Sequence, residues 1–528
     1  MWSRLRKLWR NRQEEKTASP KREETLSSQL EANADRIKTE FGDSADIQIR
    51  RLRIGRDGQR HALLISIDGL IDKKYLTEAV LLPLVQTDIP TGSGVEVFQY
   101  LKEQMLAVAE VTETDRMARV LMALGGGDSV LFVQDVAKAL IFDTKGWEQR
   151  GIEEPITEST IRGSKEGFVE NIRTNTALLR RRIRSPRLRV EEYTIGRVSQ
   201  TRIALVYVDG LAEERMVDEV RRRLEGIDVD AIQGSGHLEE YITDAPYSPF
   251  PVWMPTERPD RAAGALLEGR IVILIDGTPF QLVAPATFTM FLDTGEDYCS
   301  DYLIASLLRP LRFAAFVASL ILPSVYVAIV TFHQEMLPTS LILSIASQRE
   351  GVPLPTVFEA LMMETIFEVM REAGVRLPRI VGTAISIIGA LVLGEAAIRA
   401  ELVSPIMAVV VAATGIASFS VPIYSFGIAP RMLRFVFLLL AGSLGLFGVI
   451  VGLFALHIHL VSLRSLGVPY FEPLAPLVVS DLKDSLIRAP WWSMDTRPRL
   501  VGEKSGSRRQ RRHLRPGRFP TERREKER

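Results

Sequence analysis

One long apolar block constrains what this chain of 528 residues can fold into. It covers residues 311–463 and contains four apolar runs, for which we expect membrane-spanning helices over about 313–332, 380–397, 404–424 and 435–462. A transmembrane helix needs roughly 20 consecutive apolar residues, whereas a soluble core helix of this length normally keeps a polar face. The block therefore predicts an α-helical polytopic transmembrane domain over 301–475.

The stretch between the first two runs is unusual. Residues 337–347 are apolar but too short to cross, and residues 357–375 mix apolar residues with acids. We expect an interfacial or re-entrant element over 335–375, because irregular backbone at membrane depth is tolerated only inside protein or beside water. Four spans place both chain ends on one side, while a fifth within 337–375 would separate them. We prefer four spans.

The charges around the first span indicate its orientation. Arg309 and Arg312 precede it, and few basic residues follow it immediately. By the positive-inside rule, the large N-terminal part is cytoplasmic. The chain begins with charged residues and no apolar core, so no secretory signal peptide is expected. The single cysteine, Cys299, excludes a disulfide framework within the chain.

The soluble part contains an internal repeat. Asp68-Gly69-Leu70 recurs as Asp209-Gly210-Leu211, 141 residues later, and each follows an apparent strand and precedes an apparent helix. At the same shift, residues 130–135 (VLFVQD) fall on residues 271–276 (IVILID). Two matches at one offset favour duplication over chance recurrence of a common pattern. We expect two related cytosolic α/β subdomains, over 29–148 and 187–300.

Charged segments separate and flank these domains. Residues 1–28 form a basic tail and linker, and residues 476–528 form a cytosolic C-terminal segment with a basic, disordered tail. Residues 149–186 connect the subdomains through an Arg-rich helical segment. Its cluster is Arg180, Arg181, Arg182 and Arg184. Such a cluster binds phosphate or acids of a neighbouring subunit, or is simply the charged face of a helix. No aromatic residues interleave with it, so nucleic acid is not expected as a partner.

The sequence offers no catalytic constellation. Residues 125–127 are three glycines, but no Lys-Ser or Lys-Thr follows them, as a phosphate-binding loop requires. His457 and His459 are two apart, hence on different faces of a helix, and make a poor metal pair. We therefore expect no enzyme activity, no catalytic residues, no metal and no cofactor.

Several membrane positions are candidates for an ion path. Thr383, Ser386 and Ala390 share one face of the second span, where small and hydroxyl residues permit either close helix packing or a narrow pore. Glu395 lies near the end of that span. In a ring of subunits it would form an acidic collar favouring cations; the alternative is an ordinary interfacial acid.

A second candidate collar lies on the helix before that span. Glu364, Glu368 and Glu372 recur every four residues and so share one helical face. The alternative is that this face is the solvated side of an interfacial helix, which we favour.

Five segments resemble one known family. They include residues 161–183 (IRGSKEGFVENIRTNTALLRRRI) and 364–397 (ETIFEVMREAGVRLPRIVGTAISIIGALVLGEAA), with shorter matches over 337–355, 463–477 and 481–492. Together they resemble the A-subunit of the GerA-type spore germinant receptors of endospore-forming bacteria. The resemblance covers about residues 30–498, and the basic tail after Gly502 is longer than the family pattern.

The resemblance implies a role in spore germination at the spore inner membrane. It implies three further partners besides the lipid bilayer: a B-subunit resembling amino-acid transporters, a C-subunit lipoprotein, and further copies of this chain in a homo-oligomeric ring. It implies that this ring is an ion channel opened by a nutrient germinant. The alternatives are a non-conducting scaffold subunit of the receptor and the stage-V sporulation paralogue. A secondary transporter would need inverted repeats among its spans, and the repeat found here lies in the soluble part.

Overall fold

A computed structural model describes residues 25–90, 92–105, 111–146, 154–155, 157–376, 394–494 and 496–502. The chain forms two compact units, each made of segments that are separated in sequence. Unit 1 comprises Met1–Glu154, Glu166–Leu238 and Pro255–Leu282, and unit 2 comprises Pro155–Lys165, Glu239–Met254 and Val283–Arg528. The division therefore does not follow the predicted boundary at residue 300, since parts of the second subdomain belong with the C-terminal half.

Two five-stranded sheets organise the first half of the chain. The strands of the first sheet are β1 (Ile47–Ile54), β2 (Arg60–Ile67), β3 (Val111–Thr114), β4 (Ser129–Val133) and β5 (Ala139–Phe142), in the order β1-β2-β4-β5-β3. Those of the second are β6 (Leu188–Ile195), β7 (Thr201–Val208), β8 (Met254–Thr256), β9 (Ile271–Ile275) and β10 (Gln281–Ala284), in the order β6-β7-β9-β10-β8. The two orders are the same, and this is the arrangement that a duplicated unit predicts. Gly69 and Gly210, which follow β2 and β7, also both have positive φ.

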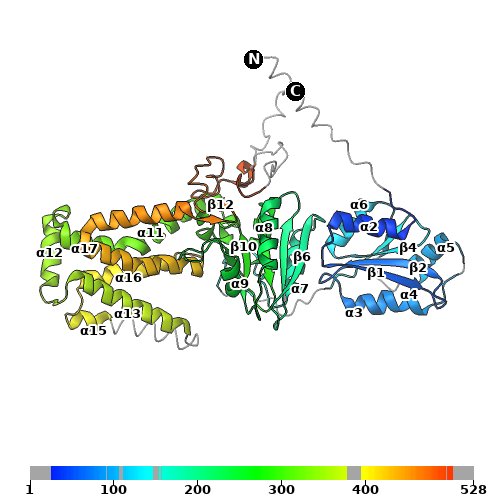
Figure 1. The fold of residues 1–528 in the computed structure, drawn as a ribbon, viewed down its shortest axis with the longest axis horizontal. Helices are drawn as coiled ribbons and strands as arrows, with labels where there is room; N and C mark the ends of the chain where they lie inside the picture. The colour runs from blue at the N-terminus through cyan, green and yellow to red at the C-terminus, as the bar shows by residue number, and fades with distance from the viewer. Residues whose placement is uncertain are drawn as a thin grey trace, which may run out of the picture. The chain divides into compact units, whose positions relative to one another are not determined.

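Helices cover both faces of the first sheet (Figure 1). In β2, Leu63 and Ile65 pack with α2 (Leu30–Phe41) and α6 (Met117–Gly126). Leu64 points to the opposite face, because side chains alternate along a strand. That face is covered by α3 (Lys73–Leu76), η1 (Thr77–Leu81), α4 (Leu82–Gln86), α5 (Gly94–Tyr100) and η2 (Leu101–Met105). Burial on both faces explains why β2 reads as a continuous apolar run.

The remaining helices of unit 1 belong to the second sheet and to the connection between the sheets. They are α7 (Ile172–Arg182), α8 (Glu214–Glu225), α10 (Pro259–Leu267) and the first half of α9 (Ser235–Ile242). The connecting helix α7 begins where the Asn171 side chain accepts hydrogen bonds from the backbone N–H groups of Arg173 and Thr174, as N-cap residues do. The Arg cluster predicted from the sequence lies at its C-terminal end.

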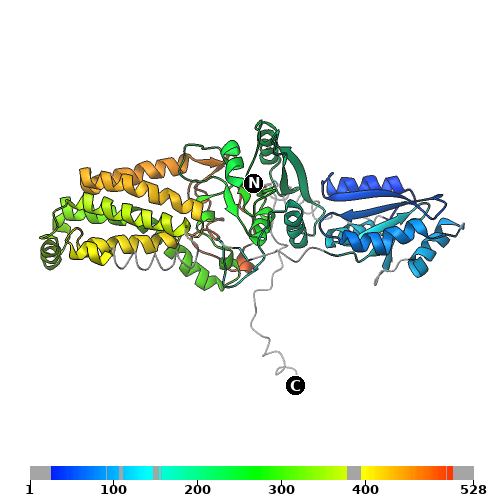
Figure 2. The same ribbon diagram turned by 90° about the horizontal axis from the view of Figure 1, so that it is seen from below.

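Unit 2 is dominated by a bundle of apolar helices, which lie alongside one another in Figure 2. Its helices are α11 (Tyr302–Phe332), α12 (Thr339–Arg349), α13 (Thr356–Arg376), α15 (Gly394–Arg399), α16 (Pro405–Phe419) and α17 (Tyr424–Ser462). The core is formed by α11, α13, α16 and α17, through residues such as Leu320, Ala360, Val411 and Leu438. Short elements surround the bundle: η3 (Phe288–Phe291), η4 (Gly295–Tyr298), η5 (Gln334–Met336), β11 (Arg464–Ser465), β12 (Val468–Pro469) and η7 (Trp491–Ser493).

Helix α17 is two helices joined by a tight turn at Gly445. The φ and ψ angles of Gly445 are 62° and −145°, which are not helical. Residues on either side then face each other: a Cβ at Gly448 would meet the carbonyl oxygen of Leu440, and one at Gly452 would meet the Phe437 ring. The segments 424–444 and 446–462 therefore form an antiparallel helical hairpin within the bundle.

The chain enters and leaves the bundle at the same end. Phe288, which precedes α11, packs edge-on against Phe316 of α11 and Phe426 of α17, with ring centroids 5.5 Å apart in each case. Its backbone N–H also donates to the carbonyl of Tyr470, just after α17, at 2.7 Å. An aromatic cluster thus ties together the segments before the first helix and after the last.

These observations correct two predictions. A single uninterrupted span over 435–462 is wrong, because Gly445 turns the chain within it. An interfacial position for the second half of the element over 335–375 is wrong, because α13 packs into the bundle core with Ala360 and Glu364 fully buried; a re-entrant course for 335–375 stays a prediction. Most of the predicted span over 380–397 lies outside the described residues, which resume at Gly394.

By length and composition alone, α11 and the merged element α17 in the described part of the chain could cross a membrane. The turn at Gly445 divides α17, so its two arms, 424–444 and 446–462, are each shorter than that element. Helix α16 is also strongly apolar, but it has only 15 residues.

We predict that Gly445→Ala destabilises the bundle. A Cβ at this position would lie 2.8 Å from Cε1 of His333, and backbone conformations of this kind cost a non-glycine residue about 1–3 kcal/mol. Gly427→Ala is the matched control in the same helix, since its Cβ would meet only Val421 at 3.9 Å. Melting temperatures of the full chain in detergent should fall for Gly445→Ala alone; equal values for both variants would contradict the strained turn.

Candidate functional site: charges inside and beneath the helical bundle

Helix α13 carries a row of glutamates into the bundle. Glu364, Glu368 and Glu372 share one helical face, as their spacing predicts, but their surroundings differ. Glu364 is fully buried, Glu368 is partly buried, and Glu372 is exposed and paired with Arg376 on its own helix. The favoured expectation of a uniformly solvated face is therefore wrong for Glu364.

Glu364 forms a buried ion pair with Arg434 of α17. Nη1 of Arg434 donates to Oε2 of Glu364, and Nε of Arg434 donates to the backbone carbonyl of Ser319 in α11 at 2.8 Å. Both side chains are at most 1% exposed. Oε1 of Glu364 and Nη2 of Arg434 make no hydrogen bond. The pair joins three helices, and removing either partner would leave an uncompensated charge in an apolar interior.

A second set of charges continues the row towards the end of α13. Glu368 pairs with Arg371 at 3.2 Å and with Arg431 of α17 at 3.6 Å. Arg371 also donates to the Ser418 hydroxyl of α16 at 2.8 Å. Its guanidinium lies 4.7 Å from the centroid of the Phe367 ring, in the range of a cation–π contact. Helices α13, α16 and α17 are thus also tied at this level.

Glu359, near the start of α13, accepts hydrogen bonds at the start of another helix, α16. Its Oε1 accepts hydrogen bonds from the backbone N–H of Ser404, at 2.6 Å, and from the Ser404 hydroxyl. Ser404 is the N-cap of α16, and a carboxylate is favourable beside the positive end of a helix dipole. Since the starts of α13 and α16 meet here and their ends meet at Arg371 and Ser418, the two helices run parallel.

The remaining pore candidates are Glu395 and the face of the second predicted span. Glu395 is exposed on α15 and pairs with Arg399, four residues on, at 2.6 Å. Thr383, Ser386 and Ala390 lie outside the described residues. The structure thus brings Glu364 and Glu368 together with cations and leaves Glu395 at the surface of the chain.

In unit 1, the four predicted arginines take different roles. Arg180 is buried and makes a bidentate pair with Asp46, at 2.7 and 2.9 Å, which fixes α7 to the first sheet. Arg181 and Arg182 pair with Glu166 at 3.2 and 2.7 Å. Arg181, Arg182 and Arg184 line a cavity of about 980 Å³ together with Arg119 and Lys145. The cavity is therefore predominantly basic.

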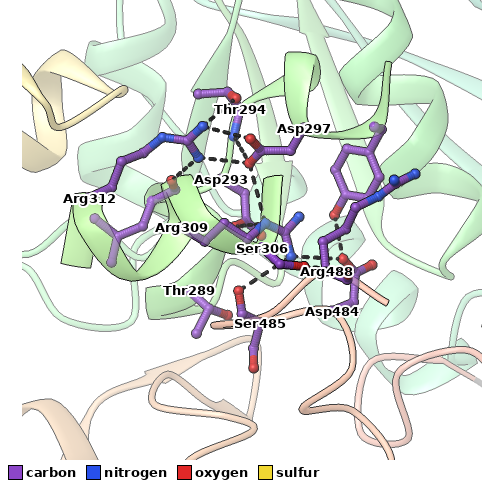
Figure 3. Close-up of polar contacts among 12 residues, drawn as sticks. Thr289, Asp293, Thr294, Asp297, Ser306, Arg309, Arg312, Asp484, Ser485 and Arg488 are labelled. Carbon is purple, nitrogen blue, oxygen red and sulfur yellow. Dashed lines mark hydrogen bonds and ion pairs between the residues drawn. The ribbon is translucent and has the colours of Figure 1, made fainter. Parts of the chain in front are cut away.

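A second charge network, which the sequence reasoning missed, lies at the start of α11 (Figure 3). Arg312 makes a bidentate pair with Asp297, at 2.6 and 2.7 Å. Arg309 is buried; its Nε lies 3.1 Å from Asp293 and 3.3 Å from Asp297, and its Nη1 donates to Asp484 at 3.0 Å. From the sequence alone, both arginines indicate only the orientation of the first span. The available signal in the sequence was the i, i+3 spacing of the two arginines, which follow a short segment rich in aspartate.

This network attaches the C-terminal segment to the base of α11. The Ser306 hydroxyl donates to the backbone carbonyl of Arg488 at 2.8 Å, and the Tyr298 hydroxyl donates to Asp484 at 3.1 Å. Burial alone would raise the pKa of Asp297, but the hydrogen bonds from Arg312 and the charges of Arg312 and Arg309 outweigh it and lower the pKa. Asp297 is therefore ionised at neutral pH and holds two cations in place.

We predict an acid-sensitive contribution from Asp297. Its pKa in the folded chain lies below the ordinary value of 3.8, so its stabilising effect is complete above that value and is lost as the pH falls through the lowered pKa. Melting temperatures of the full chain in detergent, measured between about pH 5 and pH 3, should fall more steeply for the native chain than for Asp297→Asn. Parallel curves would contradict the lowered pKa.

We also predict strong energetic coupling between Glu364 and Arg434. Glu364→Gln or Arg434→Met alone should lower stability by about 3–5 kcal/mol, because each leaves the other group buried and unpaired. The double variant should lose less than the sum of the two. Glu372→Gln is the control, since its pair with Arg376 is exposed. Additive losses in thermal unfolding would show that the pair is not coupled.

Among the described residues, no group of three or more His, Cys, Asp or Glu side chains is placed to hold a metal ion.

Comparisons with known proteins agree over most of the chain. A family model described as Bacillus/Clostridium GerA spore germination protein matches residues 35–500. Spore germination protein KA of Bacillus subtilis (strain 168) is 45% identical over 478 residues, which is 90% of this chain and 88% of that protein. The membrane protein YfkQ of the same organism is 40% identical over 481 residues, 91% of this chain and 93% of that protein.

A solved structure is also similar. It is the crystal structure of the N-terminal domain of the A subunit of the Bacillus megaterium spore germinant receptor GerK3, which is 36% identical and matches with a TM-score of 0.40. The match covers 50% of this chain and 98% of that one. The family model and the relatives each cover most of the sequence, so the chain belongs to the GerA family of spore germination proteins.

Proposed function

We propose that this chain is the membrane subunit of a nutrient germinant receptor and that it oligomerises into a germinant-gated ion channel. The observation that supports this most strongly is the ion pairing of Glu364 and Glu368 of α13 with arginines inside a mostly apolar bundle. Ionisable groups inside membrane-spanning segments are costly, and they mark ion paths, relays or moving elements. A plain membrane anchor would not need Glu364 and Glu368.

The bundle supports insertion in a membrane, which we place at the spore inner membrane with the large N-terminal domain cytoplasmic. Helix α11 is long and apolar, the two arms of α17 are apolar as well, and the relative YfkQ is described as a membrane protein. A span over 380–397 is part of this proposal, and it is compatible with the parallel course of α13 and α16. Together with α11, α13, α16 and the two arms of α17, it gives this proposal six crossings in place of the four that we expected from the sequence. An even number agrees with the chain entering and leaving the bundle at one end.

The pore itself we assign to copies of the span over 380–397. Thr383, Ser386 and Ala390 would line it, and Glu395 would form an acidic collar that favours cations. Glu364 and Glu368 are neutralised by Arg434 and Arg431 within one chain, so they are poor collar residues in this arrangement. We assign them to holding α13 against α17, so that movement of this pair of helices can open or close the path.

Germinant binding would act by population shift. The family resemblance implies a transporter-like B-subunit, which would bind the nutrient, and a C-subunit lipoprotein. A germinant that binds the open arrangement more tightly shifts the ring towards it, and cations would then leave the spore core. The basic cavity beside Arg181, Arg182 and Arg184 is a contact for an anionic group of a ligand or a neighbouring subunit in this scheme.

The main alternative is a scaffold subunit that assembles partners without conducting ions. The exposed position of Glu395 and its local pair with Arg399 favour this alternative, because neither requires a pore. The stage-V sporulation paralogue is a second alternative within the family. Conductance of the purified complex in a planar bilayer separates the first alternative from a channel: a complex that assembles but passes no current would overturn our proposal.

We predict that Thr383→Leu and Ser386→Leu block conductance without preventing assembly, because a bulky apolar side chain would close a narrow hydroxyl-lined path. Ser443→Leu is the matched control: Ser443 is exposed on α17 and donates only to carbonyls of its own helix. Single-channel current in bilayers and ion release from spores measure the effect. Normal current in both variants would rule out this face as the pore.

A further inference from the structure

The base of α11 is apolar on the outside and charged on the inside. Arg309 and Arg312 point inward to Asp293, Asp297 and Asp484, and Arg309 is only 3% exposed. A soluble protein has the reverse arrangement. Apolar side chains of the first three turns instead face outward and are 39–73% exposed: Leu303, Ile304, Leu307, Leu308 and Leu311. Their spacing places them on one stripe of the helix.

The C-terminal segment widens this stripe. Trp491 and Trp492 are exposed next to it. The Trp492 ring packs edge-on against Tyr302, at 5.6 Å between centroids, and the Trp491 ring packs against Tyr298 at 5.8 Å. Ile487, in the same segment, is also exposed. Exposed apolar surface of this extent marks a site of interaction.

The length of α11 places this surface at a particular depth. Its 31 residues span about 46 Å, whereas the hydrocarbon core is about 30 Å thick. The uncharged run begins only after Arg312. The turns that carry the apolar stripe therefore extend beyond the hydrocarbon core into the region of the lipid headgroups.

We propose that this surface, made of the stripe on α11 with Ile487, Trp491 and Trp492, lies in the boundary between lipid headgroups and acyl chains. Trp and Tyr are enriched at that depth, because their rings are apolar and their N–H and O–H groups are polar. Residues 503–528 follow directly and carry eleven Lys and Arg against four Glu, a net charge of +7. That charge favours an anionic lipid surface over a basic protein partner. The inference rests on the membrane insertion proposed above.

The position of this surface keeps the charge of Arg309 away from lipid. Its charge stays within the protein network while the helix around it contacts lipid. The stripe thus lets α11 enter the membrane boundary without exposing either arginine to acyl chains, where an unpaired charge is expensive.

Collision measurements on a nitroxide label test the proposal. Cys299 is the single cysteine, so Cys299→Ser provides a background for Leu307→Cys in the full chain reconstituted in phosphatidylglycerol-containing nanodiscs. Phe454→Cys, on the exposed side of α17, reports on the bundle, and Tyr247→Cys, which is fully exposed outside it, reports on water. The ratio of oxygen collisions to collisions with a water-soluble nickel chelate should fall in the order 454, 307, 247.

The outcomes are distinguishable. A ratio at position 307 equal to that at 247 would place the stripe in water and overturn the inference. Suppressed collisions with both reagents would show that protein covers the stripe, and would also overturn it. A water-like ratio at position 454 would overturn the proposed membrane insertion itself.

Tryptophan quenching gives a second test with no introduced cysteine. Phosphatidylglycerol brominated near the headgroup should quench the native chain, and Trp491→Phe/Trp492→Phe should lose most of that quenching. Trp253→Phe is the control, because Trp253 is fully buried. Unchanged quenching in the double variant would overturn the assignment of this surface to lipid.

Discussion

The structure of unit 2 depends on one constraint: a charge inside an apolar bundle must have a partner. Removing an ion from water costs several kcal/mol, and only a close opposite charge with further hydrogen bonds offsets that cost. Glu364 and Arg434 meet this requirement across α13 and α17, with the Ser319 carbonyl of α11 as a third contact. The packing of three helices is therefore specified by polar contacts as well as by apolar area.

Buried charges are also paired at the base of the bundle, but there the residues are arginines and aspartates from three segments. Asp293 and Asp297 neutralise Arg309 and Arg312, and Asp484 joins them from the far end of the sequence. The two networks differ in composition. The upper one contains more arginines than acids once Arg371 and Arg431 are included, whereas the lower one contains three aspartates around two arginines.

Much of the first half of the chain could be predicted from sequence, because strand periodicity and the Asp-Gly turns are local signals. The recurrence at residues 68 and 209 corresponds to turns with positive φ at Gly69 and Gly210 in two sheets of one strand order. The packing of the helical bundle was harder to predict from sequence. A glycine among leucines reads as helix, so nothing local distinguishes Gly445 from Gly427, and only the close approach of Phe332 and His333 identifies the turn. Likewise, periodicity placed Glu364 on a face with Glu372 but could not reveal which of them faces Arg434.

The contact between Arg309 and Asp484 has a consequence for the order in which the molecule is built. The two residues are 175 positions apart, and every other helix of the bundle lies between α11 and Asp484 in the chain. During synthesis, α11 is made with Asp293 and Asp297 already available, but Asp484 emerges only after the Gly445 hairpin is complete. The base of the first helix is therefore closed by nearly the last folded segment to leave the ribosome, so the contact links the completion of the chain to the completion of the bundle.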